Sequence, residues 1–433
     1  MATHNPQPRP KQGRLQEVIK LEGDFRRKLL RFLTNWIALP FLATLISVMI
    51  LGRAANWVVG PDSYKVYVIG NLSEPESKEI ADAFSADRLP QINGTKVDIV
   101  ELDDSGDPDT AQQISLRISA LGDTLLVVGH LESTPTQKAL PAYLQLADPP
   151  IPVILTTETN PNLLPRNVDG LYQPVFRLSP NDNKQAKKAA NFLSARGGAR
   201  IWVVEDRANP VYSQYLAREF VRQIHALPPK QSEPAARVLL WSTNYSIPPP
   251  SAVTDLGINW VFFAGEPQSA LVLIRQLTAI RKTHPINILL SDWCVDSSLL
   301  ANGGKDVENV YLTHPLKVQV YNQGRYTVYG KDSFQLVKQL LSEGDQQFDH
   351  FAGQDRKFGY TLRKLLGLRR VSDARRVLAL EMQGAVLGNK TFSLSNGGEA
   401  SFDGTSNRLH ATFEVWQIRN GKFDTPISAE ETP

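Results

Sequence analysis

From residue 64 onwards, short apolar runs rich in β-branched residues alternate with segments of helical periodicity. Lys65–Ile69, Val97–Leu102, Thr124–Val128 and Arg200–Val204 are four of these runs, and a helical segment follows each of them. Two parallel strands need a crossover connection, which is usually a helix. Strands that are apolar at nearly every position are buried on both faces of their sheet. The alternation therefore predicts an α/β fold of parallel sheets covered by helices.

The expected strands are too many for one continuous sheet, and a turn sequence divides them. Ser179–Asp182 (SPND) lies between an expected strand and an expected helix. We therefore expect two Rossmann-like lobes with parallel sheets, joined by hinge crossovers. Ligands of such sheets bind beyond the carboxyl ends of the strands, so two facing lobes predict a cleft that closes about a hinge. The predicted boundaries are residues 62–178 with about 313–395 for the first lobe, 179–312 with about 400–425 for the second, and 426–433 for a tail.

An uncharged segment of 20 residues, Phe32–Leu51, precedes the first lobe. As a helix it is about 30 Å long, which matches the hydrocarbon core of a bilayer. We therefore expect one N-terminal transmembrane helix at residues 32–51. Basic residues crowd its N-terminal side, from Arg26 to Arg31, and only Arg53 follows closely. This asymmetry predicts a cytoplasmic tail at residues 1–31 and a single-pass inner-membrane protein whose lobes lie on the periplasmic or extracellular side.

Two other interpretations of this segment remain open. A cleaved signal peptide has an apolar region of about 7–15 residues and a small-residue cleavage site. Phe32–Leu51 is longer than that, and Gly52-Arg53-Ala54 is a poor cleavage site. A buried core helix is the third interpretation, although the segment is apolar on all faces. Length and flanking charges favour the membrane anchor.

The charge distribution argues against a nucleic-acid partner. The formal net charge of the chain is +3, but residues 1–31 alone carry eight Lys or Arg against three acidic residues. The tail therefore has a net charge of +5 and the rest of the chain −2. Proteins that bind nucleic acids carry their basic excess on the folded domain. We expect no nucleic-acid partner.

No sequence motif indicates catalysis, a cofactor or a metal. The chain contains no G-x-S-x-G, H-E-x-x-H, G-x-G-x-x-G or Walker A pattern. Its single cysteine, Cys294, allows neither an intrachain disulfide nor a zinc site of several thiolates. We expect that the protein is not an enzyme and uses no cofactor.

A series of short motifs occurs in a fixed order along the lobes. Asp103–Pro108 (DDSGDP) follows a strand, Gly129–Ser133 (GHLES) ends a strand, and Thr159–Leu163 (TNPNL) comes after another. Three further motifs follow, namely Phe176–Asp182 (FRLSPND), Tyr329–Ser333 (YGKDS), and Ser401–Gly404 with Val415–Phe423 (SFDG, VWQIRNGKF). In this order they resemble type I periplasmic binding proteins, in particular the leucine/isoleucine/valine-binding group of ABC transporter substrate-binding proteins. The resemblance covers residues 64–423.

The resemblance implies a ligand site with specific residues. Ser133 falls where a hydroxyl and neighbouring backbone amides hold the ligand carboxylate, and Thr159 falls where a second hydroxyl helps. Thr157 corresponds to a backbone carbonyl that accepts a hydrogen bond from the ligand ammonium. Tyr212 corresponds to a second-lobe tyrosine that closes over the ligand.

The chain departs from this family pattern at two positions. Glu266 stands where the family has its other second-lobe aromatic residue, and Trp293 stands where it has an acidic partner for the ammonium. The missing negative charge is expected from Asp292, Asp296 or Glu266. An unpaired buried ammonium is costly, so loss of this acid would change the class of ligand.

Simpler structural roles remain open for the same residues. Ser133 and Thr159 are also suited to capping helices, Tyr212 to packing, and Trp293 to an apolar wall. His130, at the mouth of the expected cleft, is either structural or a ligand contact.

By resemblance, the expected function is a membrane-anchored solute-binding protein that captures a small polar ligand, an amino acid or a related amide or carboxylate, for an ABC-type permease. The alternative is a ligand-sensing receptor domain that signals through a cytoplasmic partner.

Overall fold

The computed structural model describes residues 61–164, 173–228, 237–243, 248–354, 370–395 and 398–425. The tail at 1–31, the expected transmembrane segment at 32–51 and the tail at 426–433 lie outside the described residues. No helix in the described ranges is both long enough and apolar enough to cross a membrane.

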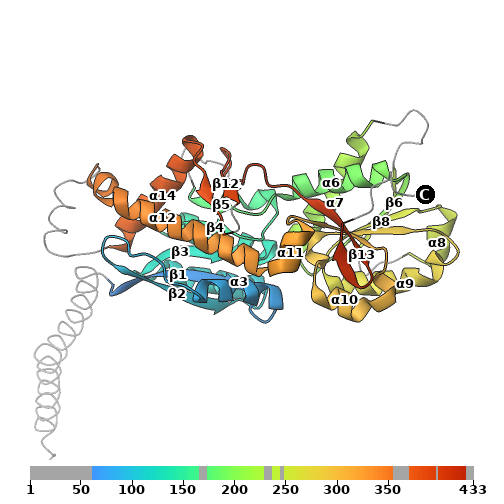
Figure 1. The fold of residues 1–433 in the computed structure, drawn as a ribbon, viewed down its shortest axis with the longest axis horizontal. Helices are drawn as coiled ribbons and strands as arrows, with labels where there is room; N and C mark the ends of the chain where they lie inside the picture. The colour runs from blue at the N-terminus through green and yellow to red at the C-terminus, as the bar shows by residue number, and fades with distance from the viewer. Residues whose placement is uncertain are drawn as a thin grey trace, which may run out of the picture. The chain divides into compact units, whose positions relative to one another are not determined.

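A five-stranded parallel sheet forms the centre of the first half of the fold (Figure 1). Its strand order is β2-β1-β3-β4-β5, and every neighbouring pair is parallel. We call this sheet, with the helices packed on it, the first lobe. The strands are β1 (Ser63–Gly70), β2 (Lys96–Asp103), β3 (Thr124–Gly129), β4 (Val153–Leu155) and β5 (Val175–Arg177).

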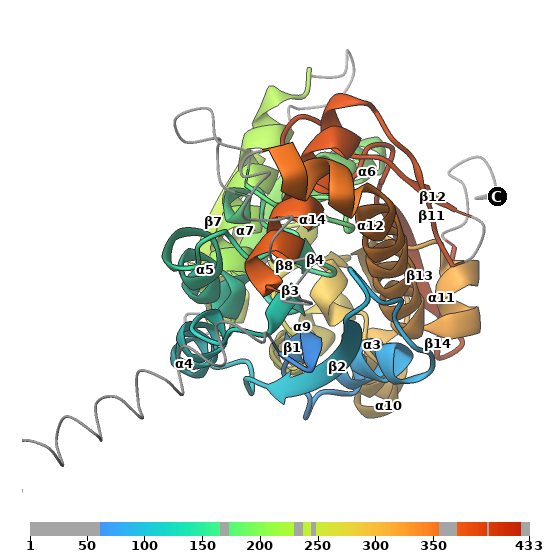
Figure 2. The ribbon, with the colours of Figure 1, turned by 90° about the vertical axis from the view of Figure 1, so that its left-hand side faces the viewer.

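Helices cover both faces of the first sheet, as the apolar strands predict (Figure 2). Tyr64, Val66 and Val68 of β1 belong to a core with α3, α12 and α14, whereas Tyr67 and Ile69 belong to a core with α4 and α5. This alternation follows from the two-residue repeat of a strand. The helices are α3 (Pro75–Ser85), α4 (Pro108–Ser119), α5 (Ser133–Pro141), α12 (Thr327–Gln354) and α14 (Val371–Leu387).

A seven-stranded mixed sheet forms the centre of the second half, which we call the second lobe. Its order is β14-β13-β10-β9-β8-β6-β7, parallel from β7 to β10 and antiparallel from β10 to β14. The strands are β6 (Arg200–Glu205), β7 (Arg237–Thr243), β8 (Trp260–Ala264), β9 (Asn287–Leu290), β10 (Tyr311–His314), β13 (Glu414–Arg419) and β14 (Lys422–Asp424).

Two helix layers enclose the second sheet. One core packs it against α6 (Asp182–Ala195) and α7 (Pro210–Ala226), and another against α9 (Pro267–Arg281) and α10 (Ser297–Gly303). Residues of β6 alternate between these cores, with Ile201 on the α7 side and Trp202 on the α9 side. Two short helices remain. Helix α8 (Pro250–Asp255) lies between β7 and β8, and α11 (Val318–Gly324) lies between β10 and α12.

The described chain passes between the lobes three times. The first crossing leads from β5 to α6, the second from β10 through α11 to α12, and the third from Phe402, in the first-lobe core, to β13. The first and third run side by side, because Arg177 exchanges backbone hydrogen bonds with Ser406 (3.0 Å) and Arg408 (3.1 Å). The boundary expected after residue 178 lies at the first crossing. Those expected at about 313 and 400 lie close to the other two, and the domain division stays a prediction.

Candidate functional site

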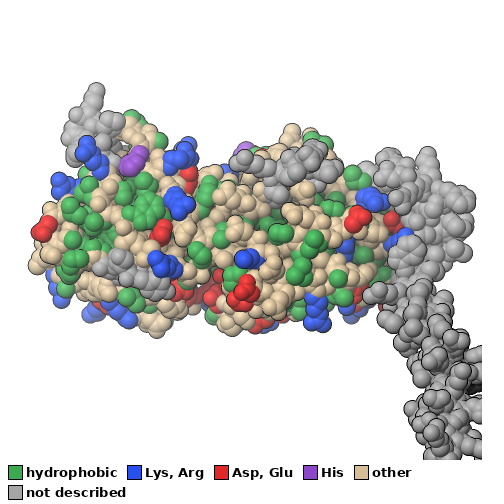
Figure 3. All heavy atoms as spheres, turned by 180° about the vertical axis from the view of Figure 1, so that it is seen from behind, with side chains coloured by type: hydrophobic (Ala, Val, Ile, Leu, Met, Phe, Trp, Pro, Cys, Tyr) green, Lys and Arg blue, Asp and Glu red, His purple; other side chains and the backbone are tan. Residues whose placement is uncertain are grey.

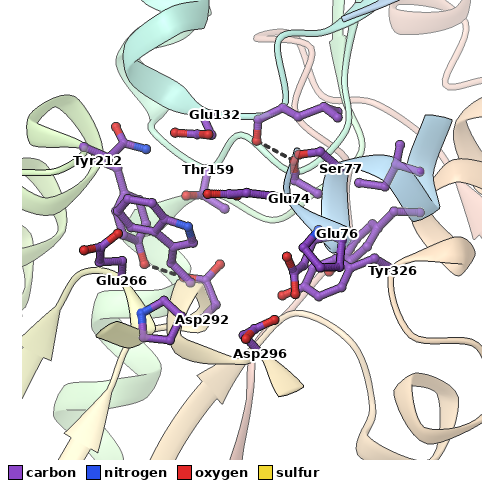
Figure 4. Close-up of a pocket in the computed structure, with 18 of the residues that line it drawn as sticks. Glu74, Glu76, Ser77, Glu132, Thr159, Tyr212, Glu266, Asp292, Asp296 and Tyr326 are labelled. Atoms are coloured by element: carbon purple, nitrogen blue, oxygen red, sulfur yellow. Dashed lines mark hydrogen bonds between the residues drawn. The ribbon is translucent and has the colours of Figure 1, made fainter. Parts of the chain in front are cut away.

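A cavity of about 250 Å³ lies between the lobes, at the carboxyl ends of both parallel sheets. Its first-lobe walls are the segments that follow β1, β3 and β4, and its second-lobe walls are those that follow β6, β8, β9 and β10. Figure 4 shows these walls converging on one space. The cavity therefore occupies the position expected for the ligand of two facing α/β lobes.

Helices begin at this cavity from both lobes. The first residues of α3, α5 and α9 line it, as do Tyr212 in the first turn of α7 and Ser297 at the start of α10. Prolines in the first turn help to fix these starts: Pro75 begins α3, Pro210 begins α7 and Pro267 begins α9. The N-terminal ends of these helices are consequently directed toward the space between the lobes.

The structure brings all six residues of the predicted ligand site to this cavity. Ser133, Thr157, Thr159, Tyr212, Glu266 and Trp293 line it. So do Asp292 and Asp296, the two further candidates for the missing negative charge. Their contact with a ligand stays a prediction, because geometry alone establishes only that they are in place.

The capping role that remained open for Ser133 and Thr159 is wrong. The N-cap of α5 is Glu132, and Asn160 caps the short 3-10 turn Pro161–Leu163. Neither hydroxyl therefore occupies an N-cap position. The Thr157 hydroxyl donates to the backbone oxygen of Leu131 (2.7 Å), so it ties the end of β4 to the end of β3.

Tyr212 and Trp293 form one side of the cavity with Asp292. The Tyr212 hydroxyl donates a hydrogen bond to Asp292 Oδ1, and Gln185 Nε2 donates to the same oxygen at 2.8 Å. The rings of Tyr212 and Trp293 meet edge to face, with centroids 6.0 Å apart and an interplanar angle of 89°. Since its hydroxyl is held by Asp292, Tyr212 offers the cavity mainly its ring.

His130 has the structural role. It is 0% exposed and does not line the cavity. Its Nδ1 lies 2.7 Å from Asp104 Oδ2, and its Nε2 lies 2.7 Å from the Tyr143 hydroxyl. Both ring nitrogens are therefore used to join the end of β3 to the loop after β2 and to the start of the π-helix Ala142–Leu146 that follows α5.

The Glu158 side chain accepts hydrogen bonds from backbone N–H groups that follow β3 and β4. These donors are the backbone nitrogens of Leu131 (3.1 Å), Thr156 (2.8 Å) and Thr157 (2.9 Å), and the Thr136 hydroxyl lies at 3.3 Å. Glu158 is only 1% exposed. Burial raises the pKa of Glu158, while the backbone hydrogen bonds oppose that rise. The protein thus places its own carboxyl group on amides that would otherwise bind an anion.

Acidic side chains dominate the cavity wall. Seven of them line it, namely Glu74, Glu76, Glu132, Glu158, Glu266, Asp292 and Asp296, whereas no Lys or Arg does among the described lining residues. His314 also lines the cavity, but burial lowers its pKa to about 3, so it is neutral. On the face shown in Figure 3, acidic side chains gather near the hollow between the two halves.

The crowding of acids shifts their ionisation. Burial raises the pKa of Glu132 to about 8, and the neighbouring charges of Glu74 and Asp104 add to the effect. Burial and a hydrogen bond with Asp296 raise the pKa of Glu76 to about 8. Burial and the charge of Glu266 raise the pKa of Glu74 as well. Near neutral pH some of these groups therefore hold a proton when the cavity is empty.

The residues of the cavity wall that were not predicted from the sequence include Glu74, Glu76, Glu132, Tyr326 and Tyr329. Glu74 and Glu132 could have been predicted, because each lies between an expected strand and the helix that follows, where ligands of parallel sheets bind. Tyr326 and Tyr329 come from the second crossing, and no local pattern connects them with strand ends in the two sheets.

A family model described as "Periplasmic binding protein" matches residues 78–324. The chain therefore belongs to the periplasmic binding proteins, as the motifs predicted. The Leu/Ile/Val-binding protein of Escherichia coli K12 is 30% identical over 166 residues, 36% of this chain and 42% of that protein. An amino acid binding protein of Pseudomonas aeruginosa is 28% identical over 141 residues, 32% of this chain and 35% of that protein. The chain thus aligns with less than half the length of these relatives.

Solved structures share the fold over most of the chain. The leucine binding protein LivK of Thermotoga maritima has a TM-score of 0.63 at 17% identity, with 85% of this chain and 100% of that chain covered. A solute binding protein of R. palustris in complex with 4-hydroxybenzoate has a TM-score of 0.59 at 14% identity, with 85% and 96% covered. These likenesses establish the two-lobed α/β fold, which holds chemically different ligands in different proteins.

Proposed function

We propose that the protein captures a small polar solute in the cavity between its lobes and presents it to an ABC-type transporter. The observation that carries this proposal is the cavity itself, walled by strand ends and helix starts from both lobes. A solute held by both lobes stabilises the closed arrangement relative to the open one. The relatives named as amino acid binding proteins support the same function.

The lobes also touch directly beside the cavity. The Thr134 hydroxyl donates to Asn209 Oδ1 and accepts from the backbone nitrogen of Val211 (3.2 Å). Asn160 Nδ2 donates to the backbone oxygen of Val211. These polar contacts join α5 and the end of β4 to the start of α7. Such contacts can exchange with water when the lobes separate, which suits a hinge that opens and closes.

The proposal includes membrane attachment through residues 32–51, with the cleft on the periplasmic or extracellular side. The charge asymmetry around the segment supports this orientation. Protease added to cells with a permeabilised outer barrier should digest the lobes and spare residues 1–31. Digestion of the tail alone would reverse the topology.

The function is tested by a thermal-shift screen of the purified full-length protein with amino acids, amides, small carboxylates and amines. We expect at least one class to raise the Tm in a concentration-dependent way. If no compound does so, the proposal of a solute-binding cleft is wrong. If a compound does raise the Tm, co-purification with a permease would support transport, and co-purification with a signalling protein would support the sensing alternative.

A further inference from the structure

We propose that the solute is an organic amine with at least two positive charges, held between carboxylates of both lobes and the faces of aromatic rings. This inference rests on the proposed function, since it names the ligand class of the same cleft. Three observations carry it: the sign of the wall charges, the orientation of the acids, and an aromatic wall with an unpartnered hydroxyl.

The sign of the wall charges favours a cation. The seven carboxyl groups of the cavity form no ion pair among the described residues. Arg325 lies near Glu76, but it pairs with Glu79 at 3.3 Å and does not line the cavity. Arg177 interacts electrostatically with Glu158, yet it is fully buried outside the wall. A ligand with positive charge would supply the missing counterions.

Three of the acids stand at helix starts without capping the backbone of their own helices. Glu74, Glu132 and Glu266 occupy the N-cap positions of α3, α5 and α9, and none of them makes a side-chain capping bond. Glutamate is not a preferred N-cap residue, because shorter side chains reach the free backbone amides better. Figure 4 shows Glu74 and Glu132 on the first-lobe side and Glu266 on the second-lobe side of the space. Glu74 and Glu132 thus remain available to a ligand, whereas Glu266 also accepts a hydrogen bond from the Ser269 hydroxyl of α9 (3.1 Å).

Aromatic rings provide the rest of a cation site. Tyr212, Trp293, Tyr326 and Tyr329 line the same cavity. The Tyr326 hydroxyl donates to the backbone oxygen of Val295 (2.8 Å), so this residue offers its ring. Tyr329 is only 6% exposed, and its hydroxyl has no hydrogen-bond partner among the described residues. A bound ammonium group would give this buried oxygen a donor and place positive charge over the rings.

Other ligand classes fit less well. A simple carboxylate would meet seven acidic groups, and the amides at the ends of β3 and β4 already bind Glu158. Within the described ranges, no cluster of three or more His, Cys, Asp or Glu side chains has the arrangement of a metal site. Acids face the cavity from both lobes, so two separated positive charges use more of the wall than one. A diamine or polyamine meets these conditions.

Isothermal titration calorimetry on the full-length protein tests the proposal with four probes: putrescine, spermidine, L-leucine and 4-hydroxybenzoate. We expect one of the amines to bind most tightly, and its affinity to fall as salt is raised. Glu132→Gln and Glu74→Gln should each weaken amine binding about tenfold or more, since each removes a charged partner. Glu399→Gln is the matched control, because Glu399 is exposed on the first lobe outside the cavity, and it should leave the affinity unchanged.

The outcomes separate this inference from the function on which it rests. Binding of leucine or 4-hydroxybenzoate without binding of the amines would overturn the inference and keep the solute-binding cleft. Absence of binding for all four probes would overturn the inference, and the wider thermal-shift screen would then decide the function. Equal weakening by Glu132→Gln, Glu74→Gln and Glu399→Gln would show non-specific attraction and would also overturn it.

Discussion

Glu76, in the first turn of α3, and Asp296, the N-cap of α10, place two carboxyl groups near each other at the cavity between the lobes (Figure 4). Burial alone would raise the pKa of Asp296, but hydrogen bonds from Glu76 and Ser298 lower it. The pKa of Glu76 rises to about 8, so Glu76 is mainly protonated at neutral pH while Asp296 is ionised. Protonation of Glu76 therefore removes the repulsion that the two groups would exert on each other if both were ionised.

The first prediction concerns stability against pH. Glu76 and Glu132 have folded-state pKa values of about 8, above the ordinary value of 4.5. The folded protein therefore binds more protons than the unfolded chain between these values, and their contribution is full below pH 4.5 and lost as pH rises through about 8. We expect the Tm of the ligand-free protein to fall more steeply between pH 6 and 8.5 than that of the double variant Glu76→Gln with Glu132→Gln.

Glu399→Gln again provides the control for this comparison, because that side chain is exposed. Relief of about 1 kcal/mol of repulsion would raise the Tm of the double variant at pH 8.5 by roughly 1–2 °C. Parallel pH profiles for the natural protein and the double variant would show that these two carboxyl groups do not titrate as described.

The second prediction concerns protons released on binding. An ammonium group beside Glu132 favours the ionised carboxylate and so lowers its pKa. At pH 7.5 the binding of a diamine should release protons, and calorimetry in buffers of different ionisation enthalpy measures their number. Glu132→Gln should release fewer. Net proton uptake by the natural protein would contradict the expected direction.

The third prediction concerns Glu158. Its side chain accepts from the backbone nitrogens of Leu131, Thr156 and Thr157. Glu158→Gln would turn an amide N–H₂ toward at least one of these donors and leave it unsatisfied. We expect a loss of about 1–3 kcal/mol in the free energy of unfolding, measured by urea denaturation. An unchanged free energy of unfolding would show that these backbone donors do not need the Glu158 carboxyl group.

The fourth prediction concerns the contact between Thr134 and Asn209. Thr134→Ala removes a hydroxyl that bonds to Asn209 and Val211 across the lobes. Loss of about 0.5–1.5 kcal/mol from the closed arrangement should raise the ligand off-rate roughly 2- to 12-fold, with little change in on-rate. Stopped-flow measurement provides both rates. Thr254→Ala, on the exposed α8, is the control, and an equal effect there would rule out a specific role for the lobe contact.

The sequence allowed much of the fold to be predicted, because most strands are buried on both faces and therefore apolar. The run at Val97–Leu102 is β2 (Lys96–Asp103), and the run at Arg200–Val204 is β6 (Arg200–Glu205). β10 (Tyr311–His314) was missed, because Thr313 and His314 leave it only two apolar residues. The helical segment expected after Thr124–Val128 is α5, and it changes into a π-helix at Ala142–Leu146, after Pro141, which lacks a backbone donor.

The site was predictable where its residues follow strands. Ser133 comes after β3 and Thr159 after β4, and both positions belong to the edge where ligands of parallel sheets bind. The excess of acids was not predictable, because Glu76 and Asp296 are 220 positions apart and only the facing lobes bring them together. Tyr329 reaches the cavity from α12 for the same reason.

Backbone amide exchange, with and without the tightest ligand of the calorimetric panel, tests the central claim of a solute held between the lobes. We expect the ligand to slow amide exchange in both lobes, at the first turns of α3 and α5 in the first lobe and of α7 and α9 in the second. Protection confined to one lobe, or located away from these helix starts, would contradict it.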